Sequence, residues 1–362
     1  MDVTNKVGVR EFIAVILLVI GSKLADNTPA ILVQEARNSF WMIPLVALAP
    51  FIPPFLLFLH LLKKHKNKNL IELVNHILGR YAGFVLGFLI FLMTFATLVI
   101  DSRSFVEELS ILYYPKTPLL VLLGVLLLIC GLGARLGIQY VMTASWVILP
   151  YVKVSVIFLF ILALTNNEWR RIFPIWGDGF DVVLIEGVKN VSLFTDLVLL
   201  TMAYTSLRKT TVYHRAAYWG LGIVSLELCI AFLLYATMFD YKSIDTVAYH
   251  FHEVTQYIHL GIYFTNIETY FMFFWLLAII IRFIIYLYFT TWILAAVFNI
   301  QNFRRLVLPL AVLTIWLGIL PENSIELTLT YRKELLFVIS LFFLTTPFLL
   351  WTVEKVKGGI KA

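Results

Sequence analysis

The stretch FIAVILLVIGSKLADNTPAILVQE, residues 12–35, decides how the rest of the chain is interpreted. Small and polar residues interrupt its apolar run midway: Gly21, Ser22, Lys23, Asp26 and Asn27. Hydrocarbon cannot hydrogen-bond a loose backbone group, so a broken crossing needs protein or a cavity around it. Opposed helix ends offer carbonyl oxygens to an ammonium group and N–H donors to a carboxylate. We therefore predict that this gap forms half of a small-molecule site near the membrane midplane. The alternative is a kinked helix in which Gly21 and Ser22 only allow close helix packing.

The chain as a whole has the composition of an integral membrane protein. Of its 362 residues, 61% are hydrophobic and only 14% are charged, whereas soluble domains are about one-quarter charged. The hydrophilic stretches are too short for a soluble catalytic domain, so we expect a function within the helix bundle and do not expect an enzyme. Both cysteines lie inside apolar runs, which indicates neither a disulfide nor a thiol metal site. We expect no cofactor and no metal.

Apolar runs predict an all-α integral membrane protein with ten transmembrane helices. The predicted spans are 9–36, 40–62, 81–109, 118–131, 137–164, 181–204, 216–239, 263–298, 305–320 and 333–352. With a cytoplasmic N-terminus, most basic residues fall in inner loops, so the positive-inside rule predicts both termini in the cytoplasm. Inner loops that meet anionic lipid account for the formal charge of +6, and no nucleic-acid partner is expected. Residues 69–79 follow a basic cluster and predict an amphipathic interfacial helix.

The sixth predicted span, DVVLIEGVKNVSLFTDLVLLTMAY at 181–204, carries a second interruption. Its small and polar residues are Gly187, Lys189, Asn190, Ser192, Thr195 and Asp196. Broken helices at equivalent positions of two five-helix halves predict an inverted repeat around a central binding site. We expect residues 1–165 to form the first half and residues 166–362 the second half of a single membrane domain.

Five motifs carry a resemblance to a known family. They are NLIELVNHILGRYAG at 69–83, YYPKTP at 113–118, FPIWGDGF at 173–180, NIETYFMFFW at 266–275, and RFIIYLYFTTWILAAVFNIQNFRRLVLP at 282–309. The last two are the most specific. With them, the chain resembles the B subunits of spore germinant receptors, within the amino acid–polyamine–organocation transporter superfamily. One departure is Asn266, where this family often has arginine.

The resemblance implies a fold, a ligand class and partners. It implies ten helices in a five-plus-five, LeuT-like inverted repeat with helices 1 and 6 broken. It implies recognition of a small germinant such as an amino acid, with a sugar or an ion as alternatives. It also implies assembly with an A subunit and a C lipoprotein in the inner membrane of the spore. The alternative function is a stand-alone proton- or sodium-coupled amino acid permease, and nothing in the predicted fold separates the two.

Ionisable residues inside a membrane cost several kcal/mol unless they are paired or hydrated, so they are candidates for function. The predicted ligand-binding residues are Gly21, Ser22, Asp26, Thr97, Asp101, Phe194, Thr195, Asp196, Arg282 and Tyr286. Arg282 can hold a carboxylate through two hydrogen bonds, and Tyr286 follows one helical turn later. The alternative for Arg282 is an internal salt bridge with Asp196 or Glu268. The alternatives for Asp101 and Phe194 are a salt bridge to another span and a core aromatic.

Other polar residues carry weaker expectations. Lys23 and Asp26 are three residues apart and could pair with each other. Glu107 and Glu108 close the third span at the outer interface and are expected to be solvated. His250, His252 and His259 form a weak metal-like pattern, which we interpret as a solvated outer loop.

Overall fold

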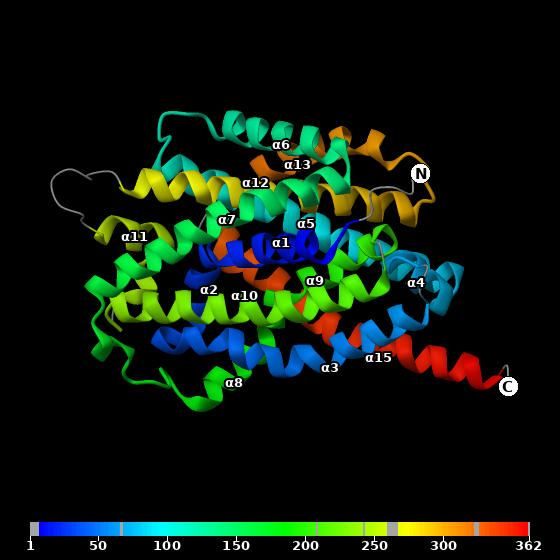
Figure 1. The fold of residues 1–362 in the computed structure, drawn as a ribbon, viewed down its shortest axis with the longest axis horizontal. Coiled ribbons are helices and arrows are strands. Elements are labelled where there is room, and N and C mark those ends of the chain that lie inside the picture. The colour runs from blue at the N-terminus through cyan, green and yellow to red at the C-terminus, as the bar shows by residue number, and fades with distance from the viewer. Residues whose placement is uncertain are drawn as a thin grey trace.

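The computed structural model describes residues 7–65, 68–207, 209–241, 243–258, 267–321 and 326–360. These residues are helical, apart from turns and one isolated bridge between Val7 and Leu207. Most of the helices run along one common axis (Figure 1), and α1 contacts α7, α10 and α12 in the interior. The α-helices are α1 (Val9–Val19), α2 (Thr28–Ala36), α3 (Ile43–Lys64), α4 (Leu70–Leu78), α5 (Arg80–Leu112), α6 (Leu119–Leu136), α7 (Ile138–Ala163), α8 (Phe180–Lys189), α9 (Asp196–Leu199), α10 (Thr210–Met238), α11 (His250–Tyr257), α12 (Ile267–Val297), α13 (Val307–Ile319) and α15 (Lys333–Ile360).

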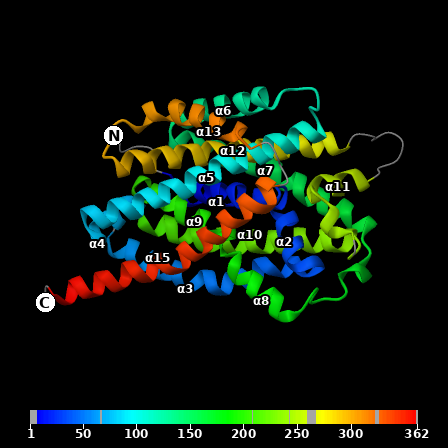
Figure 2. The same ribbon diagram turned by 180° about the vertical axis from the view of Figure 1, so that it is seen from behind.

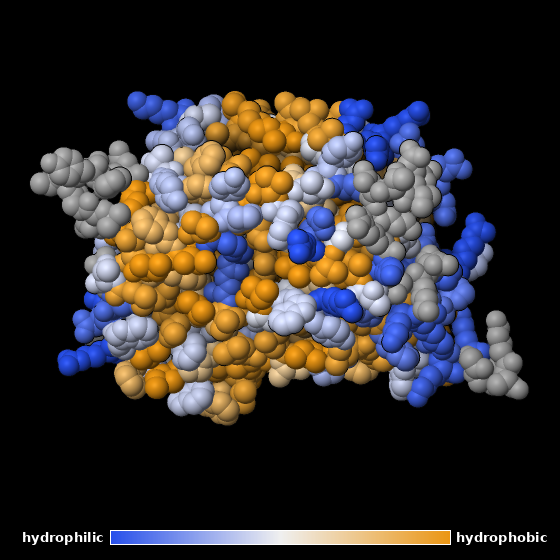
Figure 3. Space-filling model, in the orientation of Figure 1, coloured by the Kyte–Doolittle hydropathy of each residue, from blue (hydrophilic) through white to orange (hydrophobic). Residues whose placement is uncertain are grey.

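Seven helices among the described residues are long and apolar enough to cross a membrane. They are Thr28–Lys64, Arg80–Leu112, Leu119–Leu136, Ile138–Ala163, Thr211–Met238, Ile267–Val297 and Leu327–Lys357. Figure 3 shows the matching surface, with hydrophobic residues across the middle and hydrophilic residues gathered toward both ends of the long axis. The first of the seven bends sharply at Arg37, whose φ is 51°. An all-helical membrane protein is therefore the observed class, and the count of ten crossings remains a prediction.

The first predicted interruption is present in the structure. Helix α1 ends at Val19, a 3-10 turn covers Gly21–Leu24, and α2 begins at Thr28 with Pro29 in its first turn. Proline lacks an N–H group, so the first turn is the position where a helix accepts it without losing a hydrogen bond. The N–H of Thr28 donates to Asp26 Oδ1 at 2.7 Å, which satisfies a free donor at the start of α2.

The second predicted interruption is also present. Helix α8 ends at Lys189 and is followed by a 3-10 turn, Val191–Phe194. The short α9 then leads into a further 3-10 segment, Leu200–Ser206. The 181–204 stretch thus follows the ten-residue α8 only to Lys189 and contains no α-helix of more than four residues after the break.

The amphipathic segment predicted at 69–79 forms α4. Asn69 Oδ1 accepts from the N–H of Glu72, and Glu72 Oε2 accepts from the N–H of Asn69, both at 2.9 Å. This capping box satisfies two donors at the helix start. The apolar side of α4 is buried against α5 and α15, and Figure 2 shows α4 and the end of α15 at the same end of the molecule.

Candidate functional site

The side chain of Lys23 joins the two interrupted segments. Its ammonium lies 2.6 Å from Asp196 Oδ2 and donates to the carbonyl oxygens of Leu193 at 2.8 Å and Ser192 at 3.2 Å. Lys23 and Asp196 are buried, at 5% and 4% exposure. The pairing of Lys23 with Asp26 that their spacing allows is not formed, because the 3-10 turn directs Lys23 toward the second break.

Side chains satisfy other backbone groups at the two breaks. The Tyr235 hydroxyl donates to the carbonyl oxygen of Leu24 at 3.1 Å, and Lys153 Nζ donates to that of Leu17 at 3.3 Å. The N–H of Ser192 donates to Ser340 Oγ at 2.9 Å. The sequence argument expected backbone groups that are free to meet a zwitterion. In this structure the protein's own ammonium groups and hydroxyls occupy these positions, because unpaired backbone groups are costly in a membrane.

Two aspartates and two arginines form a buried cluster, which we call the tetrad: Asp26, Asp101, Arg282 and Arg332. Arg282 donates to Asp26 Oδ2 at 2.8 Å and to Asp101 Oδ2 at 2.6 Å. Arg332 donates to Asp26 Oδ2 at 2.8 Å and to Asp101 Oδ1 at 2.9 Å. Each carboxylate therefore meets both guanidinium groups. The alternative reading of Arg282 and Asp101 as internal salt-bridge residues matches this geometry, but the partners of Arg282 are not Asp196 or Glu268.

Arg332 is the member of the tetrad that the sequence argument missed. It ends a π-helical segment, Leu327–Arg332, that leads directly into α15. The predicted tenth span began at residue 333, which left Arg332 outside it. The apolar residues Leu327 and Leu329 extend the run toward the N-terminus and were the available signal. With Arg332, the tetrad ties the linker before α2 to α5, α12 and the start of α15.

A cavity of about 30 Å³, which we call the central cavity, lies between the tetrad and the second break. Six of the ten predicted site residues line it: Thr97, Asp101, Thr195, Asp196, Arg282 and Tyr286. Lys23 and Arg332 complete its charged lining, and the Tyr286 hydroxyl donates to Asp196 Oδ1. The volume is about that of one water molecule in the liquid. A larger ligand would have to displace some of these contacts.

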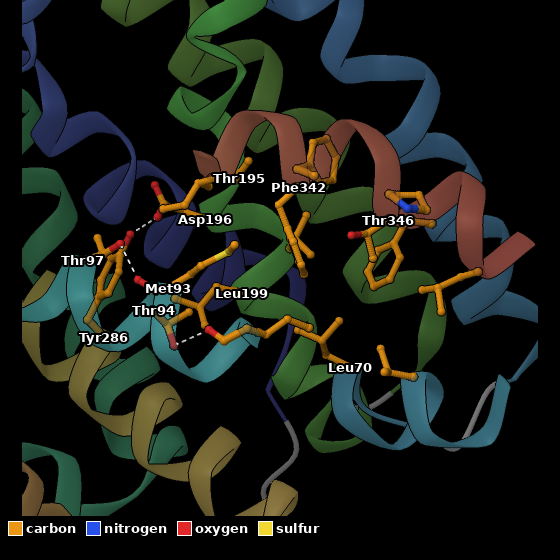
Figure 4. Close-up of a pocket in the computed structure, with 18 residues that line it drawn as sticks. Leu70, Met93, Thr94, Thr97, Thr195, Asp196, Leu199, Tyr286, Phe342 and Thr346 are labelled. Atoms are coloured by element: carbon orange, nitrogen blue, oxygen red, sulfur yellow. Dashed lines mark hydrogen bonds between the residues drawn. The ribbon is translucent and has the colours of Figure 1, made fainter. Parts of the chain in front are cut away.

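A second cavity of about 100 Å³ adjoins the central cavity and is drawn in Figure 4. The two cavities share Thr97, Thr195, Asp196, Tyr286 and Ile339 in their linings. The rest of the second cavity is mostly apolar, with Leu70 from α4 and Phe342 from α15 among its walls (Figure 4). Polar groups at one end and apolar walls at the other suit a small molecule that has both characters.

The other predicted site residues lie elsewhere. Gly21 and Ser22 line a separate cavity of about 30 Å³, although Ser22 Oγ is 3.4 Å from an Arg282 nitrogen. Asp26 belongs to the tetrad. Phe194 packs against Phe51 with ring centroids 5.5 Å apart and is not among the residues that line the central cavity.

A family model described as spore germination protein matches residues 9–326. The chain belongs to the spore germination protein family. The family resemblance inferred from the five motifs is therefore confirmed.

Three similar members of the spore germination protein family differ in how much of the chain they match. Putative spore germination protein YfkT of Bacillus subtilis (strain 168) is 26% identical over 206 residues, which cover 57% of this chain and 56% of that protein. Spore germination protein A2 of the same strain is 22% identical over 340 residues, covering 92% and 91%. Spore germination protein XB of Bacillus anthracis is 25% identical over 196 residues, covering 52% and 54%. For two of the three, the matched region spans about half of the relative.

A second buried charge cluster lies at the end of α5 in this spore germination protein. Glu108 Oε1 is 3.2 Å from His252 Nε2, and the Tyr113 hydroxyl is 3.1 Å from His252 Nδ1. Glu108 and His252 are each 2% exposed, so the expectation that they are solvated is wrong, because α11 packs against the helix bundle. Among the described residues no group of three or more His, Cys, Asp or Glu could hold a metal ion. His259 and the family departure at Asn266 lie outside the described residues.

The Tyr286 hydroxyl provides a direct test of the contact with Asp196. Replacing Tyr286 by phenylalanine is expected to destabilise the protein by about 1–3 kcal/mol, because a buried carboxylate loses a donor. Thermal unfolding of detergent-purified protein measures the effect. The control is Tyr331→Phe, since Tyr331 is 53% exposed. Equal melting temperatures for the two variants would contradict the contact.

Proposed function

We propose that the chain is the transporter-like, ligand-binding subunit of a spore germinant receptor, and that a small germinant such as an amino acid binds in the central cavity. The proposed role is binding, with no catalysed reaction. The observation that carries the proposal is the meeting of both interrupted segments at Lys23 and Asp196, beside Arg282 and Tyr286. Family membership supports a role in spore germination.

The proposed architecture is ten crossings in a five-plus-five, LeuT-like inverted repeat. The first and sixth predicted spans are both interrupted, as such a repeat requires. The start of α1 and the end of α15 lie toward the same end of the molecule (Figures 1 and 2), which supports an even number of crossings. We propose that this end, which also holds α4, faces the cytoplasm or spore core, as the basic residues predict.

Binding would rearrange charges that are already paired. A zwitterionic germinant carries an ammonium group for Asp196 and a carboxylate for Lys23 or Arg282, so it can replace their present contacts. Its apolar part would extend into the adjoining cavity between α4 and α15. The central cavity has room for about one water molecule. The ligand must therefore bind more tightly to a conformation of the protein in which this cavity is larger. A ligand shifts two states only through its differential affinity for them. That shift would signal to A and C subunits in the inner membrane of the spore.

A direct experiment separates this proposal from the alternative of a stand-alone amino acid permease. Purified protein is screened by thermal shift against amino acids and sugars, and then tested for uptake of the best ligand into liposomes. Binding without uptake, together with loss of germination on deletion, supports the receptor subunit. Accumulation of the ligand without partner proteins supports the permease. No binding of any amino acid or sugar would count against the central site.

The first break offers a test of the site by substitution. A Cβ on Gly21 would lie 3.1 Å from Lys153 Nζ and 3.3 Å from Glu227 Oε2. Lys153 and Glu227 form an ion pair. Replacing Gly21 by leucine is therefore expected to push this pair apart and to abolish the germinant response, although the protein still inserts in the membrane. The matched control is Gly222→Leu, because a Cβ there meets no atom within 4 Å. A normal dose-response curve for Gly21→Leu would argue against a binding role for this break.

A further inference from the structure

A cavity of about 240 Å³, which we call the vestibule, lies on the far side of the tetrad from the central cavity. Three of the chain segments that contain tetrad residues also contribute residues to the wall of the vestibule. Asn27 follows Asp26, Ser104 lies one turn after Asp101, and Thr328 lies one turn before Arg332. Residues one turn from the tetrad in the opposite direction, such as Thr97 and Leu336, line the central cavity instead. The tetrad thus separates the two spaces.

Three acceptor atoms from three segments around the vestibule receive no hydrogen bond. Asn27 is 7% exposed and donates to Thr328 Oγ1 at 3.3 Å, but its own Oδ1 has no donor. Glu107 Oε2 lies 3.3 Å from a nitrogen of Arg103 without forming a hydrogen bond. Asp245 pairs with Arg37 through Oδ2, and its Oδ1 is unsatisfied. Buried acceptors of this kind are rare in folded proteins, so each one calls for a donor.

The residues of the vestibule wall indicate which kind of hydrogen-bond donor a ligand should carry. Glu107 and Asp245 are carboxylates, and Asn27 adds a neutral carbonyl oxygen. An ammonium group supplies three N–H donors with a positive charge. These donors match the three acceptors, two of which belong to carboxylates that each already face one arginine, Arg103 or Arg37. Tyr249 also lines the vestibule, and burial raises the pKa of its phenol above the usual value. Its hydroxyl is protonated at neutral pH, as that of an ordinary phenol is, and can contact the rest of a ligand.

We propose that the vestibule is a second ligand site, which binds a small organic molecule through its ammonium group. The site is separate from the central cavity and does not depend on the proposed function. Asn27 follows the tetrad residue Asp26 in the linker before α2. An occupant of the vestibule is therefore placed next to the contacts that close the central cavity on this side.

A cysteine-protection experiment tests the site directly. Ala30 lines the vestibule and is partly exposed, so Ala30→Cys is introduced after Cys130 and Cys229 have been replaced by alanine. The rate of modification by a methanethiosulfonate reagent is measured with increasing n-propylammonium chloride. We expect saturable slowing by n-propylammonium and none by neutral n-propanol. A cysteine at the exposed Ala82, near the start of α5, should react at an unchanged rate.

Variants locate the ammonium group within the vestibule. We expect Asn27→Leu to weaken protection by about tenfold and Glu107→Gln to weaken it by about 10- to 100-fold. Glu334→Gln, a substitution at an exposed carboxylate on α15, should have no effect. Thermal unfolding verifies that each variant is folded. If Asn27→Leu is unstable, the nearly isosteric Glu107→Gln is sufficient to test the proposal.

Four results would overturn the proposal. They are the absence of protection by n-propylammonium, equal protection by n-propanol, equal protection by potassium chloride, and full protection in folded Glu107→Gln. The second result would identify the vestibule as a water-filled space, and the third as a site for inorganic cations. A failure of amino acids to bind the central cavity leaves this test unaffected, because its readout is a residue of the vestibule.

Discussion

Replacing Arg332 by methionine is expected to destabilise the protein by about 3–5 kcal/mol, the range for breaking a buried ion pair by removing one partner. Asp26 and Asp101 would then share Arg282 alone, which leaves an uncompensated negative charge in the membrane-spanning region. The substitution should also loosen the closure between the vestibule and the central cavity. The measurement is the melting temperature of the purified protein, and the control is Arg135→Met on the exposed side of α6.

A compensating substitution separates charge balance from packing. Adding Asp101→Asn to Arg332→Met leaves one aspartate and one arginine, so we expect the double variant to be more stable than the sum of the two single losses predicts. Residues that share an ion-pair network show coupling energies of about 0.5–3 kcal/mol. Additive losses in this cycle would mean that Arg332 and Asp101 do not stabilise each other.

Local sequence patterns predicted the helical elements and the interruptions well. Gly21 and Ser22 are followed within a few residues by Pro29, and the structure has a 3-10 turn and a new helix start in this stretch. Asn69 and Glu72 likewise fix the start of α4 through a capping box. These features depend on residues that are close in sequence, so composition and spacing are sufficient to find them.

The ion-pair partners of the buried charged residues could not be predicted from local sequence patterns. Lys23 and Asp26 are three residues apart, yet Lys23 contacts Asp196 and Asp26 contacts two arginines more than 250 residues away. The reason is geometric, because the turn that ends α1 sends neighbouring side chains in different directions. The burial of Glu108 has a related cause, because no sequence pattern showed that His252 of α11 contacts its carboxylate. Partners from distant helices are determined by packing, which a single sequence does not reveal.

Lys23→Ala is the substitution with the largest expected effect on the central site. Without the ammonium, the Asp196 carboxylate keeps only the Tyr286 hydroxyl, and the carbonyl oxygen of Leu193 loses the lysine donor. The carbonyl oxygen of Ser192 keeps only its hydrogen bonds from Thr195. We expect loss of the germinant response, together with destabilisation of about 3–5 kcal/mol from an unpaired buried charge. Spore germination assays and thermal unfolding measure the two effects, and Lys116→Ala in the loop before α6 is the control.

The same variant can reveal whether a free ammonium group is able to occupy the position of the lysine side chain. Lys23→Ala leaves space beside Asp196, and ethylammonium should fill it and restore thermal stability, by about 2.7 kcal/mol at a hundredfold excess over its Kd. The double variant Lys23→Ala with Asp196→Asn has no charge to neutralise, so ethylammonium should stabilise it no more than it stabilises the unmodified protein. Equal stabilisation of the single and double variants would place the amine elsewhere. It would also remove the physical basis for a germinant ammonium at Asp196, because a ligand can displace Lys23 only if this carboxylate accepts another cation in its place.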